Sequence, residues 1–162
     1  MRKDEIILQA PKKLKGVNLK TMSYPGFPTD MQAIFASTLT VSKGTSIVIE
    51  NIFENRYKYA SELQRMGAKF EINGRTAIIK GVRKLNGVNV YAKDLRGGAA
   101  LVIAGLVAKG KTTVNNIEYI LRGYEDLDCK LNKLGARITK EVWYNEESKK
   151  WRIKFPLHGW KI

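Results

Sequence analysis

The chain repeats itself, and this repeat restricts the fold more than any other feature of the sequence. The stretch "LTVSKGTSIVIENI" at 39–52 is echoed by "GLVAKGKTTVNNIE" at 105–118, so that Gly44 corresponds to Gly110, 66 residues further on. In the same way "ELQRMGAKFEI" is echoed by "KLNKLGARITK", and Gly67 corresponds to Gly135. Self-similarity at such a spacing is typical of a supersecondary unit that has been duplicated.

Both copies follow one plan, which is clearest in the first. A short strand leads to a helix that is expected to begin with a Thr29-x-x-Gln32 capping box, and a second strand follows a Lys-Gly turn. Spacing predicts that this first helix buries one stripe of side chains: Met31, Ile34, Phe35, Thr38 and Leu39. A second helix is expected to bury Tyr59, Leu63 and Met66 and to end at Gly67.

A hairpin is expected to close each unit. Asn73-Gly74 is a strong hairpin signal, and "WYNEESKKWRI" predicts a longer hairpin in which Trp143 and Trp151 flank a polar tip. The stretch 97–108, "GGAALVIAGLVA", is too short to span a bilayer and predicts a buried helix. Farther along, Leu127, Leu131 and Leu134 mark the expected buried stripe of an amphipathic helix.

The pattern therefore predicts an α/β (α+β) fold of two tandem βαβαββ units, with mixed strand directions and helices packed under one face of each sheet. We divide the chain into a lead-in strand at 1–16, a first unit at 17–81, a linker at 82–87 and a second unit at 88–162 with an extended C-terminal hairpin.

Composition limits the class of function without deciding it. The 29 Lys and Arg residues exceed the 15 acids and leave a net charge of +14, spread along the chain, which favours a solvated basic surface but leaves a nucleic acid, a membrane surface or an anionic substrate open. Cys129 is the single cysteine and no signal peptide is evident, so a cytoplasmic location is expected. His158 has no acid or cysteine at ligand spacing, and no P-loop or GxGxxG motif occurs, so neither metal nor cofactor is expected.

The repeat also brings candidate functional residues into register. Asp30 corresponds to Arg96 and Arg56 to Arg122, all at strand-to-helix loops, where free N–H groups and the helix dipole favour an anion. Gly97 and Gly98 would let a ligand approach the backbone. The alternatives are surface arginines in salt bridges and an ordinary acid at a helix start, where the carboxylate form of Asp30 is stabilised in either case.

Four long motifs in the same order resemble the UDP-N-acetylglucosamine enolpyruvyl transferases: "YPGFPTDMQA", "NIFENRYKYASELQRMGAKFEI", "AKDLRGGAALVIAGLVAKG" and "RGYEDLDCKLNKLGA", within 17–138. The resemblance implies the family's inside-out barrel type of fold, built from βαβαββ units. It also implies transfer of the enolpyruvyl group of phosphoenolpyruvate to the 3-hydroxyl of UDP-N-acetylglucosamine, in peptidoglycan synthesis.

By the same resemblance, Asp30 and Arg122 would be catalytic, with Asp30 accepting the sugar hydroxyl and helping to remove its proton. Ile52 would contact the UDP-sugar through its backbone, and Arg96 and Arg122 would neutralise phosphoenolpyruvate. Arg56 would line the same cleft. No cofactor is implied, and Cys129 does not match the reactive cysteine of the family, which belongs to a part of the family pattern that this chain lacks.

The match covers only the C-terminal part of the family pattern, so we expect the lone chain to be inactive. An expressed fragment, half of a split enzyme with a separate N-terminal partner chain, and a repurposed module all remain open. Two functions of other classes stay as alternatives: a basic nucleic-acid-binding module, which we favour less, and a structural module that pairs as a homodimer. No membrane partner is expected.

Overall fold

The computed structural model describes residues 7–145 and 148–155, and its first half forms a four-stranded sheet. The strand order is β1-β2-β4-β3, with β1 parallel to β2 and the other neighbours antiparallel. In chain order the elements are β1 (Asn18–Lys20), α1 (Thr29–Leu39), β2 (Thr45–Ile49), α2 (Ala60–Arg65), β3 (Lys69–Asn73) and β4 (Thr76–Lys80). This is the predicted βαβαββ order.

The second half builds a sheet of the same topology, β5-β6-β8-β7, again with only the first pair parallel. Its elements are β5 (Asn89–Tyr91), α3 (Leu95–Val107), β6 (Thr112–Asn115), α4 (Glu118–Leu121), α5 (Leu127–Lys133), β7 (Thr139–Asn145) and β8 (Ser148–Phe155). The short helix α4 is an addition to the predicted plan. The mixed α/β class with duplicated units is confirmed.

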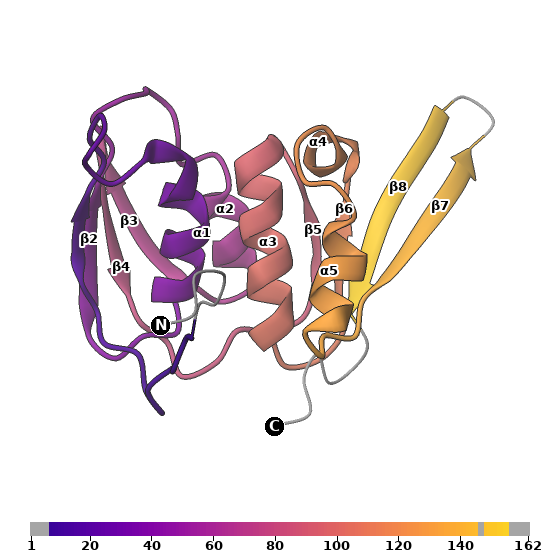
Figure 1. Cartoon of the computed structure of the whole chain (residues 1–162), viewed down its shortest axis with the longest axis horizontal. Coiled ribbons are helices and arrows are strands. Elements are labelled where there is room, and N and C mark those ends of the chain that lie inside the picture. Colours follow the sequence, from indigo (N-terminus) through magenta and orange to yellow (C-terminus); the bar gives the residue numbers. More distant parts are fainter. Residues whose placement is uncertain (1–6, 146–147, 156–162) are drawn as a thin grey trace.

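Helices α1, α2 and α3 lie between the two sheets, with α1 and α3 side by side at the centre (Figure 1). The Ser37 hydroxyl of α1 donates a hydrogen bond of 2.8 Å to the Ala100 carbonyl of α3. Buried apolar side chains of both halves, among them Leu63 and Ile153, belong to one core cluster. Each described sheet stays open at its edges, and β7 and β8 project from the body as a hairpin (Figure 1). Within the described ranges, no helix has the length and apolar character needed to cross a bilayer.

Helix α1 buries Leu39 as predicted, but most of its buried face differs from the predicted stripe. Met31 and Phe35 remain about two-fifths exposed, whereas the buried side chains of the helix are Gln32, Ala33, Ala36, Ser37 and Leu39. The reason is the close contact with α3, because two helices approach each other best through small side chains and the larger apolar ones are then displaced to the flank. Apolar spacing alone pointed to the larger side chains.

The predicted capping box is wrong as well. Pro28 occupies the N-cap position of α1, and no side chain caps this end of the helix. Thr29 instead donates its hydroxyl proton to the Glu50 carboxylate at 2.9 Å, and the amide oxygen of Gln32 accepts a hydrogen bond from the Tyr59 hydroxyl at 3.2 Å. Both side chains are therefore used in tertiary contacts that a local motif does not encode.

Several predicted features of the repeat are confirmed. Gly44 and Gly110 share the same positive φ of 97°, as expected of equivalent turn positions. The helix α2 segment buries Tyr59, Leu63 and Met66 almost completely, and its C-terminal Gly67 is left-handed, as is the equivalent glycine of the second unit. Helix α3 is buried over most of its length.

The remaining expectations have mixed outcomes. Leu127 and Leu131 pack against the core, but Leu134 is 70% exposed and Asp128 is buried on this helix instead. Both hairpins are present. In the first, Asn73 pairs with Thr76, so the two-residue loop consists of Gly74 and Arg75. Within the expected linker Leu85 is fully buried. Residues 1–6, the hairpin tip at 146–147 and His158 lie outside the described residues.

Candidate functional site

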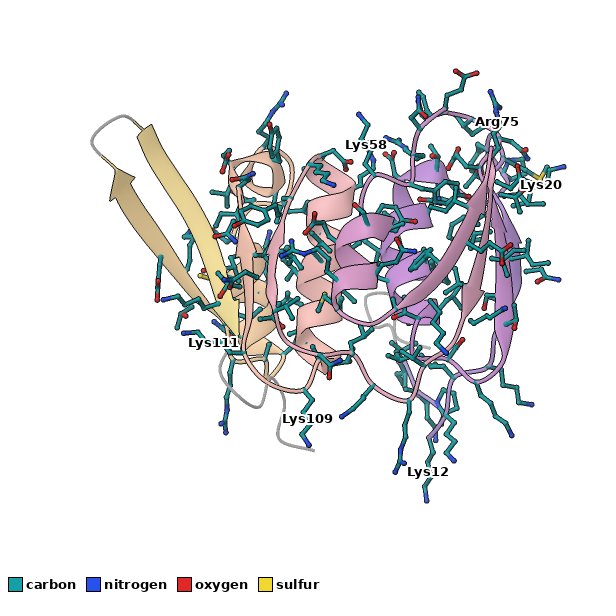
Figure 2. All side chains as sticks on the ribbon, turned by 180° about the vertical axis from the view of Figure 1, so that it is seen from behind. Lys12, Lys20, Lys58, Arg75, Lys109 and Lys111 are labelled. Atoms are coloured by element: carbon teal, nitrogen blue, oxygen red, sulfur yellow. The ribbon has the colours of Figure 1, made fainter. Side chains whose placement is uncertain are left out.

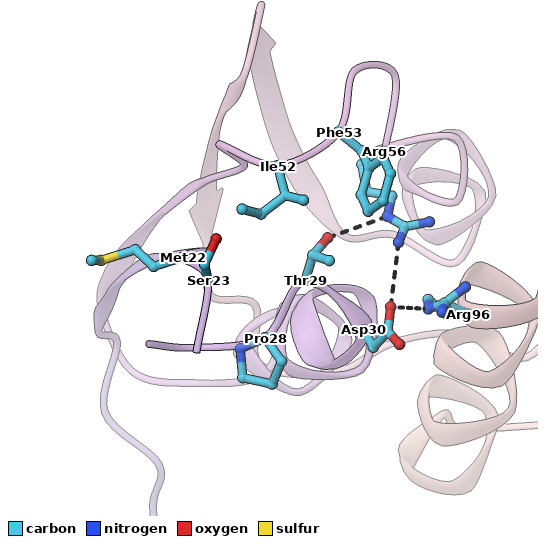
Figure 3. A pocket seen from close by; sticks show the side chains of 9 residues that line it. All are labelled: Met22, Ser23, Pro28, Thr29, Asp30, Ile52, Phe53, Arg56 and Arg96. Atoms are coloured by element: carbon cyan, nitrogen blue, oxygen red, sulfur yellow. Dashed lines mark hydrogen bonds and ion pairs between the residues drawn. The ribbon is translucent and has the colours of Figure 1, made fainter. Parts of the chain in front are cut away.

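The first turns of α1 and α3 place an acid and a base against each other. Asp30 and Arg96 are each the second residue of their helix, and because the helices lie side by side the two side chains meet. Nε of Arg96 lies 2.5 Å from Oδ1 of Asp30. Nη2 of Arg56, from the loop before α2, lies 3.4 Å from the same oxygen (Figure 3). The structure thus brings three of the predicted site residues together.

This arrangement fixes the charge of Asp30. The hydrogen bond from Arg96 is the largest effect and lowers the pKa of Asp30 below its ordinary value. Burial opposes it as the second-largest effect, and the charges of Arg96 and Arg56 lower the pKa further. The same hydrogen bond raises the pKa of Arg96. The lowered pKa agrees with the carboxylate form expected of Asp30, and its largest cause is the hydrogen bond from Arg96.

A cavity of about 510 Å³ opens beside this carboxylate (Figure 3). Its wall is formed by side chains from three segments: Met22, Ser23, Pro28, Thr29, Asp30, Ile52, Phe53, Arg56 and Arg96. The guanidinium carbon of Arg56 lies 4.5 Å from the centre of the Phe53 ring, a cation–π contact that holds the arginine at the wall. Ile52, predicted to contact a ligand through its backbone, also lies at this wall.

A second cavity of about 450 Å³ adjoins the first and is more basic. It is lined by Arg56, Lys93, Asp94, Leu95, Arg96, Tyr119 and Arg122. The predicted Arg122 follows α4 and belongs to this second cavity, not to the first. Because Arg56 and Arg96 line both hollows, an anion bound in the second would act directly on the partners of Asp30. Four cationic side chains around one hollow suit a phosphate or carboxylate group.

Asp94, the acid that lines the second cavity, caps a helix. Asp94 is the N-cap of α3, and its Oδ1 accepts a hydrogen bond of 2.7 Å from the Gly97 backbone N–H. The expectation that Gly97 and Gly98 open the backbone to a ligand is wrong. Both are buried, and a Cβ at Gly98 would lie 2.6 Å from Cγ1 of Ile120. These glycines allow α3 to pack closely, so the site is formed by side chains.

A buried carboxylate that we did not single out from the sequence supports the first cavity. Glu50 is 1% exposed and follows β2 directly. It accepts hydrogen bonds of 2.9 Å from the hydroxyls of Thr21 and Thr29, and of 2.9 and 3.1 Å from the backbone N–H groups of Ile52 and Phe53. The signal in the sequence is an acid at the end of an apolar strand, immediately before the loop "NIFENR".

Other candidates do not form a site. Cys129 is exposed, and its sulfur lies 3.9 Å from the Asp128 carboxylate in the adjacent position. Among the described residues no group of three or more His, Cys, Asp or Glu side chains is arranged to hold a metal ion. The chemistry available in this part of the chain is therefore that of one carboxylate surrounded by arginines.

The chain is similar in sequence to known proteins of one family. The family described as EPSP synthase (3-phosphoshikimate 1-carboxyvinyltransferase) matches residues 2–131. The chain is 52% identical over 145 residues to the UDP-N-acetylglucosamine 1-carboxyvinyltransferase of Desulfofundulus thermocisternus, covering 90% of this chain and 59% of that protein. It is 55% identical over 130 residues to the enzyme of the same name from Thermodesulfovibrio yellowstonii, covering 80% of this chain and 31% of that protein.

Solved structures agree with the fold. The enolpyruvyl transferase NikO from Streptomyces tendae aligns with a TM-score of 0.71 at 31% identity, over 78% of this chain and 30% of that one. EPSP synthase from Acinetobacter baumannii aligns with a TM-score of 0.60 over 95% of this chain and 34% of that one, at 18% identity, and so supports the fold alone. The chain spans about a third to three-fifths of the length of these relatives.

Proposed function

Since this chain belongs to the EPSP synthase family of carboxyvinyl (enolpyruvyl) transferases, we propose that it forms part of an enzyme that transfers the enolpyruvyl group of phosphoenolpyruvate to the 3-hydroxyl of UDP-N-acetylglucosamine. The choice of acceptor rests on the relatives at 50–55% identity, which carry the name UDP-N-acetylglucosamine 1-carboxyvinyltransferase. The proposal includes a role in peptidoglycan synthesis in the cytoplasm.

The observation that carries the proposal is the position of Asp30 between two arginines that each line two adjoining cavities. The sugar nucleotide occupies the first cavity, where the Ile52 backbone contacts it and its hydroxyl faces Asp30. Phosphoenolpyruvate occupies the second, where Arg122 joins Arg56 and Arg96 in neutralising its carboxylate and phosphate groups. This division places the nucleophilic oxygen and the enol carbon on the two sides of one carboxylate.

The ion pairs of Asp30 imply that an anion binds in the second cavity before Asp30 accepts a proton. While Arg96 and Arg56 hold Asp30, its lowered pKa makes it a weak base. An anion in the second cavity competes for both guanidinium groups, and as they turn toward it the pKa of Asp30 rises. Asp30 then accepts the proton of the sugar hydroxyl as its oxygen adds to C2 of phosphoenolpyruvate, and C3 takes up a proton from solvent to become a methyl group. Loss of phosphate together with one methyl proton from this adduct restores the double bond. Arginines around the developing charge stabilise this path.

Calorimetric titration of the 162-residue chain tests the proposal. We expect binding of UDP-N-acetylglucosamine that is weakened by Asp30→Asn, and binding of phosphoenolpyruvate that is weakened about tenfold or more by Arg122→Gln, since a charge-assisted contact contributes about 1.5–3 kcal/mol. Lys20→Gln, exposed on β1 outside both cavities, is the control. Preference for shikimate 3-phosphate over the UDP-sugar would assign the chain to the other branch of the family.

We further propose that the 162-residue polypeptide alone does not turn over. The support is that both cavities are open to solvent, whereas closed, water-excluding sites are the usual setting for such chemistry. A phosphate-release assay with both substrates is expected to show no product. Sustained phosphate release by the lone chain, abolished by Arg122→Gln, would contradict this expectation while supporting the assignment of the site.

A further inference from the structure

The basic residues of this chain are not evenly placed on the folded molecule. Helices α1 and α3 begin at the Asp30–Arg96 pair and lead, at their other ends, to turns that carry Lys43 and Lys109. Helices of 11 and 13 residues separate these ends by roughly 16–20 Å. Figure 2 shows Lys12, Lys109 and Lys111 along one edge of the molecule, away from Lys58 and Arg75.

The loops at this edge contact one another. A hollow of about 600 Å³ is lined by Lys12, Lys13, Lys43 and Arg83 together with apolar and glycine residues of the same loops. Backbone bridges then join Lys15 to Lys43 and Asn86 to Lys109. We define the basic face as the exposed cations of these neighbouring loops and of the end of β4: Lys12, Lys13, Lys15, Lys43, Lys80, Arg83, Lys84, Lys109 and Lys111.

No acid compensates this charge within the loops themselves. The segments 7–17, 40–45, 80–88 and 108–112 contain no Asp or Glu. Within the part of the chain that the structure describes, none of the nine cations is in a salt bridge. Nine cations without an ion-pair partner among the described residues repel one another, and this repulsion is relieved when an extended anionic surface approaches.

Apolar side chains on the same loops indicate which anionic surface this is. Ile7 and Leu8 are more than four-fifths exposed, Leu14 is also exposed, and Val107 is exposed at the end of α3, two residues before Lys109. The four segments contain no aromatic residue on which an unpaired base could stack, and they are turns that present no helix to a groove. Exposed aliphatic side chains between lysines match the boundary of an anionic bilayer, which takes up both.

We propose that the basic face binds the surface of an anionic lipid membrane, with its cations at the phosphate groups and its aliphatic side chains at the headgroup boundary. The site of the proposed transferase activity lies at the other ends of α1 and α3 and stays accessible in this orientation. The proposal is independent of the transferase assignment, and it differs from the expectation of no membrane partner drawn from the sequence.

Vesicle sedimentation tests the proposal. The chain is expected to sediment with vesicles of phosphatidylcholine containing about one-third phosphatidylglycerol, to stay in solution with pure phosphatidylcholine, and to be released at about 0.5 M salt. The triple variant K12Q/K43Q/K109Q should bind the anionic vesicles about tenfold or more weakly. Leu8→Ser should weaken binding at about 0.15 M salt, because it removes an exposed apolar side chain without changing the charge.

A charge-matched variant and a nucleic acid serve as controls. K20Q/K58Q/K130Q removes the same charge outside the basic face, and it should bind vesicles within about threefold of the unsubstituted chain. Circular dichroism confirms that both variants are folded. Equal losses in the two triple variants, no sedimentation at about 0.15 M salt, or tighter binding to a 20-nucleotide single strand or duplex than to vesicles would each overturn the proposal.

Discussion

Asp30 has two interactions that its position in the sequence does not reveal. An acid in the first turn of a helix is stabilised by the helix alone, but here most of the effect comes from Arg96. The folded-state pKa of Asp30 is lowered, so its contribution to stability is present above the unfolded-state pKa and is lost as the pH falls through the folded-state value. The contribution is small, about 1 kcal/mol or less, because the carboxylate is more than half exposed.

The first prediction concerns this pair. Arg96→Gln removes the hydrogen bond and one positive charge, and we expect the pKa of Asp30 to rise toward its ordinary value of 3.8. Carbon-13 NMR of the side-chain carboxyl measures the titration directly. Arg65→Gln, whose partner is Glu62, is the matched control and should leave Asp30 unchanged. A titration of Asp30 that is identical in Arg96→Gln and the unsubstituted chain would show that the pair does not form.

Glu50 provides the second prediction at the residue scale. Glu50→Gln replaces an oxygen that accepts hydrogen bonds by an NH₂ group, so one of the hydroxyl or backbone donors loses its acceptor in a buried position. We expect a loss of about 1–3 kcal/mol in the free energy of unfolding, measured by urea denaturation. Glu54→Gln, an exposed acid in the same loop, should change it by less than about 0.5 kcal/mol. Equal effects of the two substitutions would contradict the supporting role of Glu50.

At the scale of the elements, the packing of α3 is set by its glycines. A Cβ at Gly98 would lie 2.6 Å from Cγ1 of Ile120 and 3.0 Å from Cβ of Ala92. Gly98→Ala gains up to about 1 kcal/mol of helix propensity, yet overpacking of this kind costs about 1–3 kcal/mol, so the net effect is destabilising. Thermal unfolding measures it. Ile120→Ala should make room for the new Cβ, so Gly98→Ala should cost less stability in the Ile120→Ala background than in the unsubstituted chain. If Gly98→Ala costs the same in both backgrounds, the contact between the two residues is contradicted.

The order of the elements could be predicted from the sequence, whereas the contacts of their faces could not. The duplication and the left-handed glycines Gly44 and Gly110 carry the topology, because turn and repeat signals are local. The buried face of α1 is decided by α3, about 65 residues away, and Ser37 is buried for that reason. Likewise Thr29 and Glu50 meet only once β2 and α1 are packed, so no local pattern marks their hydrogen bond.

For the candidate site, too, the sequence predicted the residues but not how they are arranged. Asp30, Arg56 and Arg96 were singled out as repeat-equivalent positions, and the structure brings them within ion-pair distance. The repeat also singled out Arg122 as the equivalent of Arg56, and Arg122 lines the second cavity together with Arg56 and Arg96. Their roles toward a ligand remain predictions. What the residue pattern did not indicate is that two arginines belong to both cavities, since this depends on the relative placement of α1, the loop before α2, and α3.

At the scale of the whole molecule, the two sheets are joined by buried contacts. Glu62 of α2 is buried, and its carboxylate accepts hydrogen bonds from Arg65 of the same helix at 2.7 Å and from the backbone N–H of Tyr91 of β5 at 3.2 Å. Lys93 lies 3.4 Å from its other oxygen. These Glu62 contacts and the packing of α1 against α3 bury residues of each half against the other. The two halves are therefore not expected to unfold separately.

This expectation gives the last prediction. All three tryptophans lie in the second half of the chain, at 143, 151 and 160, so their fluorescence reports on that half alone. Leu63→Ala creates a cavity in the first half, where Leu63 is fully buried, and should cost about 2–5 kcal/mol. If the halves unfold together, the urea midpoint from tryptophan fluorescence falls by the same amount as the midpoint from far-ultraviolet circular dichroism. A fluorescence midpoint that stays in place while the dichroism midpoint falls would show two independent units, and the shared core would then contribute little to stability.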